Sequence, residues 1–348
     1  GYYIGNPSDY NAKYALDESR FWDFLETTQK EELEKLKRQS DWKIKVLGRF
    51  DKLVKKYGIL RLLRKGLAVD DAHFTLFYVA PLQNSSQSIR DNFERNQFSV
   101  TRQLRYSVAN PLEEIDMVIF INGIPISTIE LKNPWTGQNA RVHGVNQYKF
   151  KRDISQPLLN FGRCIVHFAV DTDEIYMTTK LDGAHTFFLP FNLGNNFGKG
   201  NPPNSFGHKT SYFWQDVLRR ESIANIIQHF VRFDGAENEV LNKKNLFFPR
   251  YHQLDVVRRL IKDTTQKGAG ETYLIQHSAG SGKSNSITWL AYQLIEAYPE
   301  SHAVAGNKNI NQPLFDSVIV VTDRRLLDKQ LRDNIKEFSE VKNIVAPA

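Results

Sequence analysis

The sequence predicts an α/β fold in two parts, a mixed β-sheet with helices followed by a second unit in which strands and helices alternate. Two apolar strand patterns flank Asn122-Gly123, a dipeptide typical of tight β-hairpins. Further along, a glycine-rich loop lies between a strand pattern and a helix pattern, and strands and helices then alternate. The 348 residues suffice for a core in each part, at roughly 150 residues per domain.

The first hundred residues are expected to be mostly helical. Glu, Lys and Leu recur with helical spacing from about Asp17 to Gln39, and an amphipathic basic helix follows. Between Lys43 and Lys65 the only acidic residue is Asp51, and the nine basic residues are Lys43, Lys45, Arg49, Lys52, Lys55, Lys56, Arg61, Arg64 and Lys65. This cluster either binds a polyanion such as nucleic acid or forms the solvated face of the helix, and the sequence leaves both interpretations open.

Strand patterns begin near Ala72. The expected strands span residues 74–79, 98–105, 115–121, 124–131, 163–170 and 174–179. A loop rich in Gly, Asn and Pro then covers residues 192–212, and its unusual length suggests a functional or docking loop. A helical pattern over residues 213–233 closes this part of the chain.

A polar linker at residues 234–245 marks the expected domain boundary. We therefore predict a first domain over residues 1–235, with its sheet from about residue 72, and a second over residues 236–348. The second domain should contain, in order, a helix at 253–263, a strand at 272–276, a helix at 285–298, a strand at 317–322 and a helix at 325–337. This order indicates a parallel sheet with crossover helices.

The loop His277-Ser-Ala-Gly-Ser-Gly-Lys-Ser284 lies in the strand–loop–helix context that a phosphate-binding loop requires. Gly280 and Gly282 permit tight turns, so that successive N–H groups can point at phosphate oxygens. Lys283 would reach the β and γ phosphates, and the Ser284 hydroxyl would complete the shell of a Mg²⁺ ion. The sequence therefore predicts that ATP and Mg²⁺ bind here, although His277 replaces the usual first glycine of the pattern.

A glutamine precedes this loop by about 30 residues, in the run Arg250-Tyr-His-Gln253. It resembles the adenine-reading glutamine of superfamily 2 helicases, because an amide offers both a donor and an acceptor to the base. The predicted nucleotide-binding residues are Arg250, Gln253, Ser278, Ala279, Gly280, Ser281, Gly282, Lys283 and Ser284. No Asp-Glu motif follows Asp323. We therefore expect an incomplete RecA-like domain that binds nucleotide weakly and hydrolyses it poorly.

Three charged residues lie in the two strands of the predicted hairpin: Asp116, and the pair Glu130 and Lys132 in Glu-Leu-Lys. Two carboxylates and a lysine in this pattern are typical of metal-dependent nucleases. The carboxylates hold Mg²⁺ against the scissile phosphate, and the lysine favours the hydroxide or neutralises developing charge. The predicted metal ligands are thus Asp116 and Glu130, with Ser284 at the nucleotide.

The loop of this hairpin decides whether the carboxylates meet. A strict two-residue turn places Asp116 opposite Ile129 and Glu130 on the other face of the sheet. We therefore predict a three-residue or bulged loop that pairs Ile121 with Pro125. Such a loop puts both carboxylates and Lys132 on one face.

The composition argues against an integral membrane protein and against a secreted one. No apolar run approaches the ~20 residues that span a bilayer. The single cysteine, Cys164, and the lack of a leader pattern favour a cytoplasmic protein without a membrane segment. The net charge of +7 is a modest excess, and it points to a binding partner only where basic residues cluster along the sequence. Because the chain begins with glycine rather than methionine and stops at Ala348 just after a helical pattern, we expect it to be an N-terminal part of a longer protein.

Several motifs occur in one order along nearly the whole chain. They are Phe98 to Tyr106, Ile115 to Lys132, Lys151 to Ile154, Gly200 to Pro203, Thr210 to Trp214, Arg250 to Gln253, His277 to Ser284 and Thr322 to Arg324. Together they resemble the restriction and motor (R) subunit of type I restriction-modification enzymes, in which a histidine at the position of His277 is usual.

The resemblance implies a restriction-endonuclease-like (PD-(D/E)xK) domain followed by the first of two RecA-like superfamily 2 motor domains. It implies ATP-dependent translocation on double-stranded DNA and Mg²⁺-dependent cleavage of unmodified foreign DNA, in a complex with methyltransferase and specificity subunits. The family also places a glutamine and a tyrosine four residues apart after the nuclease lysine. Gln147 and Tyr148 are the candidates here, although they do not keep that spacing.

Two other functions fit the same residues. The first is a superfamily 2 DNA remodelling or repair ATPase whose N-terminal domain only binds DNA or a partner, with structural carboxylates. The second is an RNA-directed ATPase. Loss of divalent-metal binding on Asp116→Ala would favour the nuclease over the first, and stimulation by duplex DNA or by RNA would separate it from the second.

Overall fold

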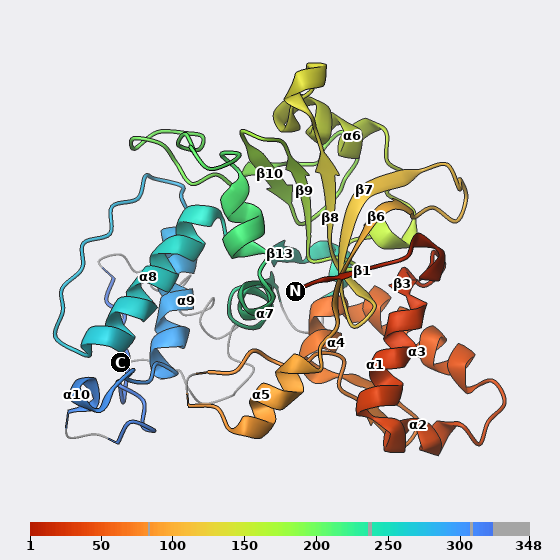
Figure 1. Cartoon of the computed structure of the whole chain (residues 1–348), viewed down its shortest axis with the longest axis horizontal. Helices are drawn as coiled ribbons and strands as arrows, with labels where there is room; N and C mark the ends of the chain where they lie inside the picture. Colours follow the sequence, from red (N-terminus) through yellow and green to blue (C-terminus); the bar gives the residue numbers. More distant parts are fainter. Residues whose placement is uncertain (83, 236–238, 307–308, 323–348) are drawn as a thin grey trace. The chain divides into compact units, whose positions relative to one another are not determined.

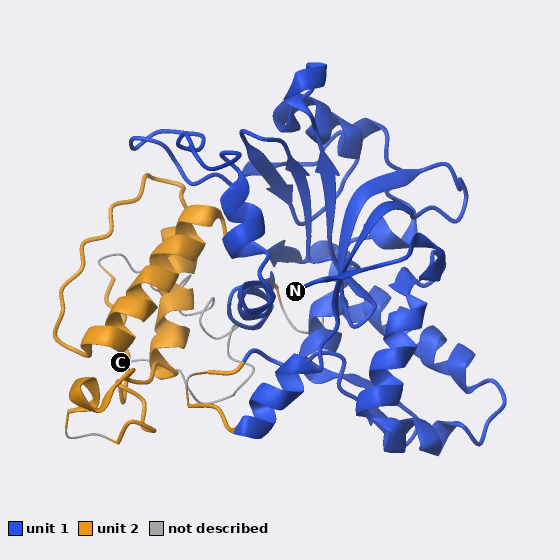
Figure 2. Ribbon diagram, in the orientation of Figure 1, with its two compact units in different colours: residues 1–80, 87–233, 238–248 blue, residues 81–86, 234–237, 249–348 orange. Residues whose placement is uncertain are grey.

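The computed structural model describes residues 1–82, 84–235, 239–306 and 309–322. The chain divides into two compact units (Figure 2). The first contains residues 1–80, 87–233 and 238–248, and the second contains residues 81–86, 234–237 and 249–348. Apart from two short segments, the second unit thus begins at Pro249. In the described part of the chain, no helix is both long and apolar enough to cross a membrane.

A seven-stranded mixed sheet is the centre of the first unit (Figure 1). Its strands lie in the order β1 (Tyr3–Ile4), β6 (Phe98–Arg105), β7 (Glu114–Ile121), β8 (Ile124–Leu131), β9 (Val166–Val170), β10 (Ile175–Thr178) and β11 (Leu189–Pro190). The β1–β6 and β8–β9 pairs are parallel, and the others are antiparallel. Strands β8 and β9 are almost wholly buried, as their continuous apolar sequences require.

Helices and small two-stranded sheets surround the large sheet. The helices of the first unit are α1 (Glu18–Thr28), α2 (Lys30–Leu36), α3 (Trp42–Tyr57), α4 (Ile59–Lys65), α5 (Gln87–Glu94), α6 (Val145–Phe150) and α7 (Arg220–His229). The small sheets pair β2 (Tyr10–Asn11) with β3 (Leu16–Asp17), β4 (Leu67–Val69) with β5 (Ala72–Phe74), and β12 (Arg232–Asp234) with β13 (Asn245–Phe247). The helix predicted over residues 213–233 is a π-helical turn, Phe213–Val217, followed by α7.

The strand predicted at residues 74–79 is wrong, because β5 ends at Phe74. Side chains take the hydrogen bonds that a neighbouring strand would have made. The Gln29 amide bonds both backbone groups of Thr75, at 2.6 and 2.8 Å, and the Asn96 amide does the same for Tyr78, at 3.0 and 2.7 Å. Satisfied in this way, the segment stays irregular without leaving buried polar groups unpaired.

The β7–β8 connection corrects the predicted three-residue loop. Ile121 pairs with Ile124, so the turn holds only Asn122 and Gly123, whose φ angles of 53° and 76° are those of a type I′ turn. The register then shifts, because Phe120 pairs with Pro125 and Ile119 pairs with Ser127. Ile126 is therefore the extra residue of a β-bulge within β8. The bulge lies in the strand, not in the loop, and it restores the parity that the acidic residues need.

Gly123→Ala is expected to destabilise the first unit by at least about 2 kcal/mol. An added Cβ would lie 2.3 Å from the Asp17 carbonyl oxygen and 2.5 Å from the Phe21 nitrogen, where α1 begins against the turn. Denaturant unfolding measures the loss. Gly137→Ala is the matched control, since its φ of 75° is equally positive but open space surrounds it. Equal losses in the two variants would contradict the close approach at Gly123.

The second unit contains α8 (Tyr251–Lys267), α9 (Lys283–Ile295) and α10 (His302–Ala305). The strands predicted at residues 272–276 and 317–322 do not form, and Leu274 and Ile319 are 94% and 83% exposed. A strand of a parallel sheet needs a neighbouring strand to accept its ladder hydrogen bonds. No strand of the described residues pairs with either segment, so both stay irregular. The helix predicted at residues 325–337, and Asp323, lie outside the described residues.

Candidate functional site

Asp116, Glu130 and Lys132 meet at the ends of β7 and β8. The register of Met117 with Ile129, continued by one pair, places Asp116 opposite Glu130. The Leu131 N–H donates to Asp116 Oδ2 at 2.8 Å. Lys132 Nζ lies 3.7 Å from Asp116 Oδ2 and 3.8 Å from Glu130 Oε2. The strand bulge thus brings two carboxylates and an ammonium group onto one face.

The two carboxylates have different surroundings. The Asp116 side chain is 37% exposed, whereas that of Glu130 is fully buried. Arg152, which follows α6, donates to Glu130 Oε1 through Nε at 2.7 Å, and one of its terminal nitrogens lies at the same distance. Burial raises the pKa of Glu130 to about 8; the Arg152 guanidinium opposes this shift and the Asp116 carboxylate adds to it.

Lys132 is held by its stem as well as by its charge. Its side chain is 9% exposed, and Nζ also donates to the Leu131 carbonyl at 3.0 Å. The π-helical turn that precedes α6, Ala140–Gly144, packs closely over it. A Cβ at Gly144 would lie 3.5 Å from the Lys132 Cγ and 2.9 Å from the Ala169 Cβ. Glycine at this position therefore lets the turn approach Ala169 of β9 closely, beside the lysine stem.

Tyr148 is fully buried beneath this site, and its hydroxyl reaches neither carboxylate. The Thr128 hydroxyl lies between the Tyr148 hydroxyl, at 2.8 Å, and His167 Nδ1, at 2.7 Å. Burial raises the pKa of Tyr148 well above its ordinary value and lowers that of His167 to about 3, so both side chains are neutral. These three residues fix α6 on the sheet. Gln147 is half-buried, and in the described structure its side chain makes no hydrogen bond to the acidic pair.

Sequence reasoning gave no role to Arg152, Thr128 or His167. The alternation of side chains along a strand could have identified Thr128, because it is two residues before Glu130 and so shares its face of the sheet. A lone histidine in an apolar strand was the signal for His167. A buried glutamate requires a cation, but the sequence does not tell which of the basic residues after α6 supplies it.

The acidic pair fits a divalent cation. Glu130 Oε2 is buried and has no hydrogen-bond partner among the described residues, which is costly unless a positive ligand is bound. The described residues place no third His, Cys, Asp or Glu with the pair. Mg²⁺ suits such a site because it commonly binds one or two carboxylates and keeps several waters. Asp116 and Glu130 would hold it.

The glycine-rich loop of the second unit contains two glycines with positive φ angles and a lysine that bonds to the loop's own backbone. Gly280 and Gly282 have φ angles of 72° and 80°, and Gly282 is the N-cap residue of α9. Lys283 Nζ donates to the carbonyl oxygens of His277, at 3.1 Å, and Ser278, at 3.0 Å. Lys283 is therefore folded toward the loop backbone. This is the side on which a phosphate-binding loop receives its anion.

Gln253 contacts this loop. Its Nε2 donates to the Gly282 carbonyl at 3.0 Å and to the Ser281 carbonyl at 3.3 Å, and its Oε1 accepts from the Arg250 N–H at 2.9 Å. Gln253 is 3% exposed, so its amide serves the loop and the start of α8. The His252 Nε2 also bonds Ser281 O, at 3.0 Å. These hydrogen bonds join the start of α8 to the loop, so Gln253 contacts it although Gln253 precedes Lys283 by 30 residues.

The remaining predicted nucleotide-binding residues surround the same loop. Ala279 is exposed, and the Ser284 carbonyl accepts from the Thr288 hydroxyl at 2.9 Å within α9. Ser281 Oγ and Arg250 Nε are buried and lack hydrogen-bond partners among the described residues. A buried hydroxyl without a hydrogen bond in a glycine-rich loop fits a polar ligand such as a nucleotide phosphate.

Comparisons with known proteins match both parts of the chain. The family model described as the type I restriction enzyme R protein N terminus matches residues 1–186, which is more than half of the chain. The model described as the res subunit of type III restriction enzymes matches residues 246–346. The second match covers the glycine-rich loop and indicates a helicase-like region.

Relatives carry related names. The HindI endonuclease subunit of a type I restriction enzyme from Haemophilus influenzae is 25% identical over 304 residues, which are 85% of this chain and 26% of that protein. The putative MjaVIIIP endonuclease subunit of Methanocaldococcus jannaschii is 25% identical over 70% of this chain and 22% of its own. The SsaAORF53P endonuclease subunit of a type I restriction enzyme from Staphylococcus saprophyticus is 24% identical over 71% of this chain and 23% of its own length.

The chain thus spans about a quarter of the length of these relatives. The acidic hairpin lies within the first matched region, and the glycine-rich loop lies within the second. The chain therefore belongs to the family of type I restriction enzyme R proteins, whose N-terminal part it represents.

Proposed function

We propose that this chain carries the nuclease and the start of the DNA motor of a type I restriction endonuclease subunit. The protein would cut unmodified foreign double-stranded DNA with Mg²⁺ and move along it with ATP, in a complex with modification and specificity subunits. The observation that carries the proposal is the cluster of Asp116, Glu130 and Lys132, in which Lys132 Nζ lies within 3.8 Å of both carboxylates. Family membership supports it.

Each residue of the cluster has a chemical task in this proposal. Asp116 and Glu130 hold the cation, which when bound polarises the scissile phosphate and lowers the pKa of a water. Lys132 presents a positive charge at the point where negative charge develops on the phosphoryl oxygens. Arg152 orients Glu130 through Oε1 and leaves Oε2, which has no hydrogen bond and lies 3.8 Å from Lys132 Nζ, to bind the cation. The restriction-endonuclease-like fold is part of this proposal, supported by the mixed sheet and its hairpin site.

In the second unit, the proposed ATP site is the loop from His277 to Ser284. Gly280 and Gly282 give the loop its turns, and Lys283 supplies its cation. On binding, the phosphates would take Lys283 from the carbonyl oxygens that now accept its hydrogen bonds. ATP hydrolysis there would drive translocation on DNA.

Divalent-metal binding by the full-length protein without nucleotide tests the nuclease assignment. Asp116→Asn is expected to weaken Mg²⁺ binding, measured by isothermal titration calorimetry, by more than about tenfold, since half of the carboxylate ligands are lost. Because the pKa of Glu130 is about 8, the metal displaces a proton below that pH. The affinity of the wild type should therefore rise as pH increases to about 8 and then level off.

Glu114→Gln is the matched control. Glu114 lies two residues before Asp116 on β7, and it pairs with Arg105 at 3.0 Å. This variant should bind Mg²⁺ as the wild type does. If Asp116→Asn also binds as the wild type does, the carboxylates are structural and the first unit is a non-catalytic binding domain.

A further inference from the structure

The basic stretch between Lys43 and Lys65 separates in the structure into residues that serve the fold and residues that do not. Arg64 donates to the carbonyl oxygens of Ile227, Gln228 and Val231 at 2.7–3.0 Å, so it caps the end of α7. Lys43 lies over the ring of Trp22, 5.2 Å from its centroid. These cations are accounted for by their contacts within the first unit.

A second group follows one face of α3. Lys45, Arg49, Lys52 and Lys56 are spaced by four, three and four residues, and all are exposed. At this spacing side chains share one side of a helix. The row is about 16 Å long, from the 1.5 Å rise per residue. Lys52, in the middle of the row, has no ion-pair partner among the described residues.

The acidic residue of the stretch does not neutralise this face. Asp51 accepts a hydrogen bond from the guanidinium of Arg163, which is 2% exposed, and it pairs with Lys55 at 2.7 Å. Its carboxylate thus faces the interior and a lysine outside the row. The net charge of the outer face of α3 is therefore strongly positive.

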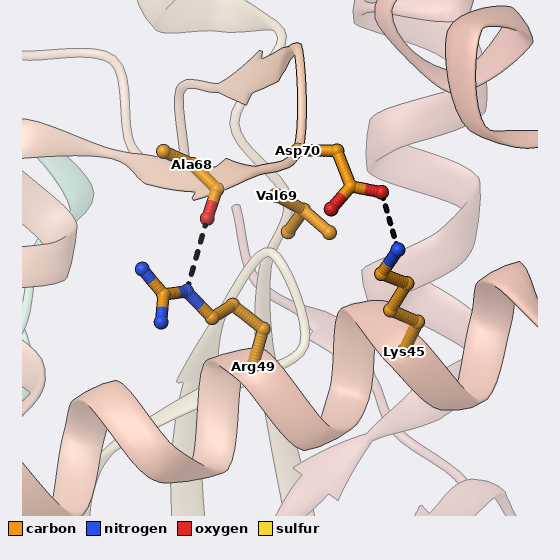
Figure 3. Close-up of a pocket in the computed structure, with 5 residues that line it drawn as sticks. All are labelled: Lys45, Arg49, Ala68, Val69 and Asp70. Carbon is orange, nitrogen blue, oxygen red and sulfur yellow. Dashed lines mark hydrogen bonds and ion pairs between the residues drawn. The ribbon is translucent and has the colours of Figure 1, made fainter.

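One end of the row borders a pocket of about 280 Å³ (Figure 3). Arg49 Nε donates to the Ala68 carbonyl at 3.3 Å, and Lys45 pairs with Asp70 across the pocket. The two terminal nitrogens of Arg49 point away from Asp70 (Figure 3). The backbone contact fixes the guanidinium plane and leaves these donors for a ligand.

The other end of the row surrounds Tyr57 with cations. Lys56 Nζ and the Arg61 guanidinium lie 4.8 and 4.1 Å from the centre of its ring. A hydrogen bond from Lys56 lowers the pKa of Tyr57, and the charges of Lys56, Arg61 and Arg49 lower it further. Cationic side chains thus continue along this face from Arg49 to Arg61.

We propose that this outer face of α3 and the start of α4 binds the phosphate backbone of duplex DNA at a second place, away from the acidic pair. A straight row of cations complements the regularly spaced phosphates of one strand. Lysine and arginine without base-reading side chains suit contact that is independent of sequence. The proposal takes duplex DNA as the substrate, as the proposed function does.

The position of α3 makes this contact remote from the site of cleavage. Phe50 of α3 packs on Phe21 of α1, with ring centroids 5.8 Å apart, and α1 abuts the β7–β8 turn at Gly123. The acidic pair lies at the opposite ends of the same strands (Figure 1). Six residue steps along β8, from Ile124 to Glu130, place the acidic pair roughly 20 Å from the turn that α1 abuts.

Salt-dependent binding of a 30-base-pair duplex to the full-length protein in EDTA, measured by fluorescence anisotropy, tests the proposal. Lys52→Ala combined with Lys56→Ala should reduce the slope of log K against log salt by about two, since each phosphate contact contributes about 0.9. Affinity at low salt should fall about tenfold or more. The control, Lys13→Ala combined with Lys30→Ala, removes two exposed lysines elsewhere in the first unit and should leave the slope unchanged.

An unchanged slope in the Lys52 and Lys56 variant, with an unchanged circular dichroism spectrum, overturns the proposal. So does a variant that binds DNA normally but no longer binds the modification or specificity subunits, because the face would then recognise a protein. The failure of the proposed nuclease is a separate result. It would appear as Mg²⁺ binding that is unaffected by Asp116→Asn. That titration contains no DNA, and its variant leaves every residue of α3 unchanged.

Discussion

Lys132→Ala should lower DNA cleavage by at least about 10²–10³-fold while ATP hydrolysis stays within about twofold of the wild type. Among the described residues, the ammonium group of Lys132 has its polar contacts within the first unit, to both carboxylates of the site and to the Leu131 carbonyl. Its loss removes the positive charge at the phosphate without touching the nucleotide loop. Cleavage of unmodified circular plasmid by the assembled complex, with Mg²⁺ and ATP, measures the first quantity, and phosphate release measures the second.

Lys151→Ala is the matched control for this experiment. Lys151 is an exposed lysine directly after α6, in the same part of the first unit. The variant should cut as the wild type does. If Lys132→Ala still cuts at the rate of the wild type, the hairpin is not the nuclease site and the first unit must be reassigned as a binding module.

Lys283→Ala should abolish ATP hydrolysis, by about 10²-fold or more, and cleavage that depends on translocation with it. Lys283 is the cation of the glycine-rich loop, and its ammonium is held at 3.1 and 3.0 Å by the carbonyl oxygens of His277 and Ser278. Alanine leaves the loop glycines in place, so the loss would reflect the missing charge. Phosphate release in the presence of duplex DNA measures the effect.

Lys262→Ala, an exposed lysine of α8, should leave hydrolysis unchanged. Continued hydrolysis by Lys283→Ala would show that the loop is not the ATP site. The two lysine variants together separate the two proposed activities. Lys132→Ala should affect cleavage alone, and Lys283→Ala should affect both.

Local sequence patterns predicted the elements that depend on neighbouring residues. Strands β6 and β8 have the predicted bounds. In β6, apolar residues are interspersed with polar ones up to Arg105, and β8 is a largely apolar run that follows the Asn122-Gly123 turn. The pattern also required that Asp116 and Glu130 share a face, and the structure brings them together. It placed the extra residue in the loop, since periodicity counts residues but does not show which one leaves the ladder.

Features that depend on distant partners could not be predicted. Arg152 pairs with a glutamate 22 residues earlier, and Gln29 replaces a strand partner for Thr75 across 46 residues. The strands expected at 272–276 and 317–322 have the composition of buried strands, but strand formation needs a neighbour as well as composition. Long-range contacts of this kind leave no periodic trace in the sequence.

The bulge at Ile126 has a consequence for the divergence of the chain. Side chains alternate between the two faces of a strand. The number of residues between Asp116 and Glu130 therefore decides whether the two carboxylates share a face. Deleting one residue between them would shift Glu130 to the other face even though both carboxylates remain in the sequence. Insertions and deletions in this hairpin should therefore occur in pairs. Hairpin length thus constrains the evolution of the site as strongly as the identity of its acids.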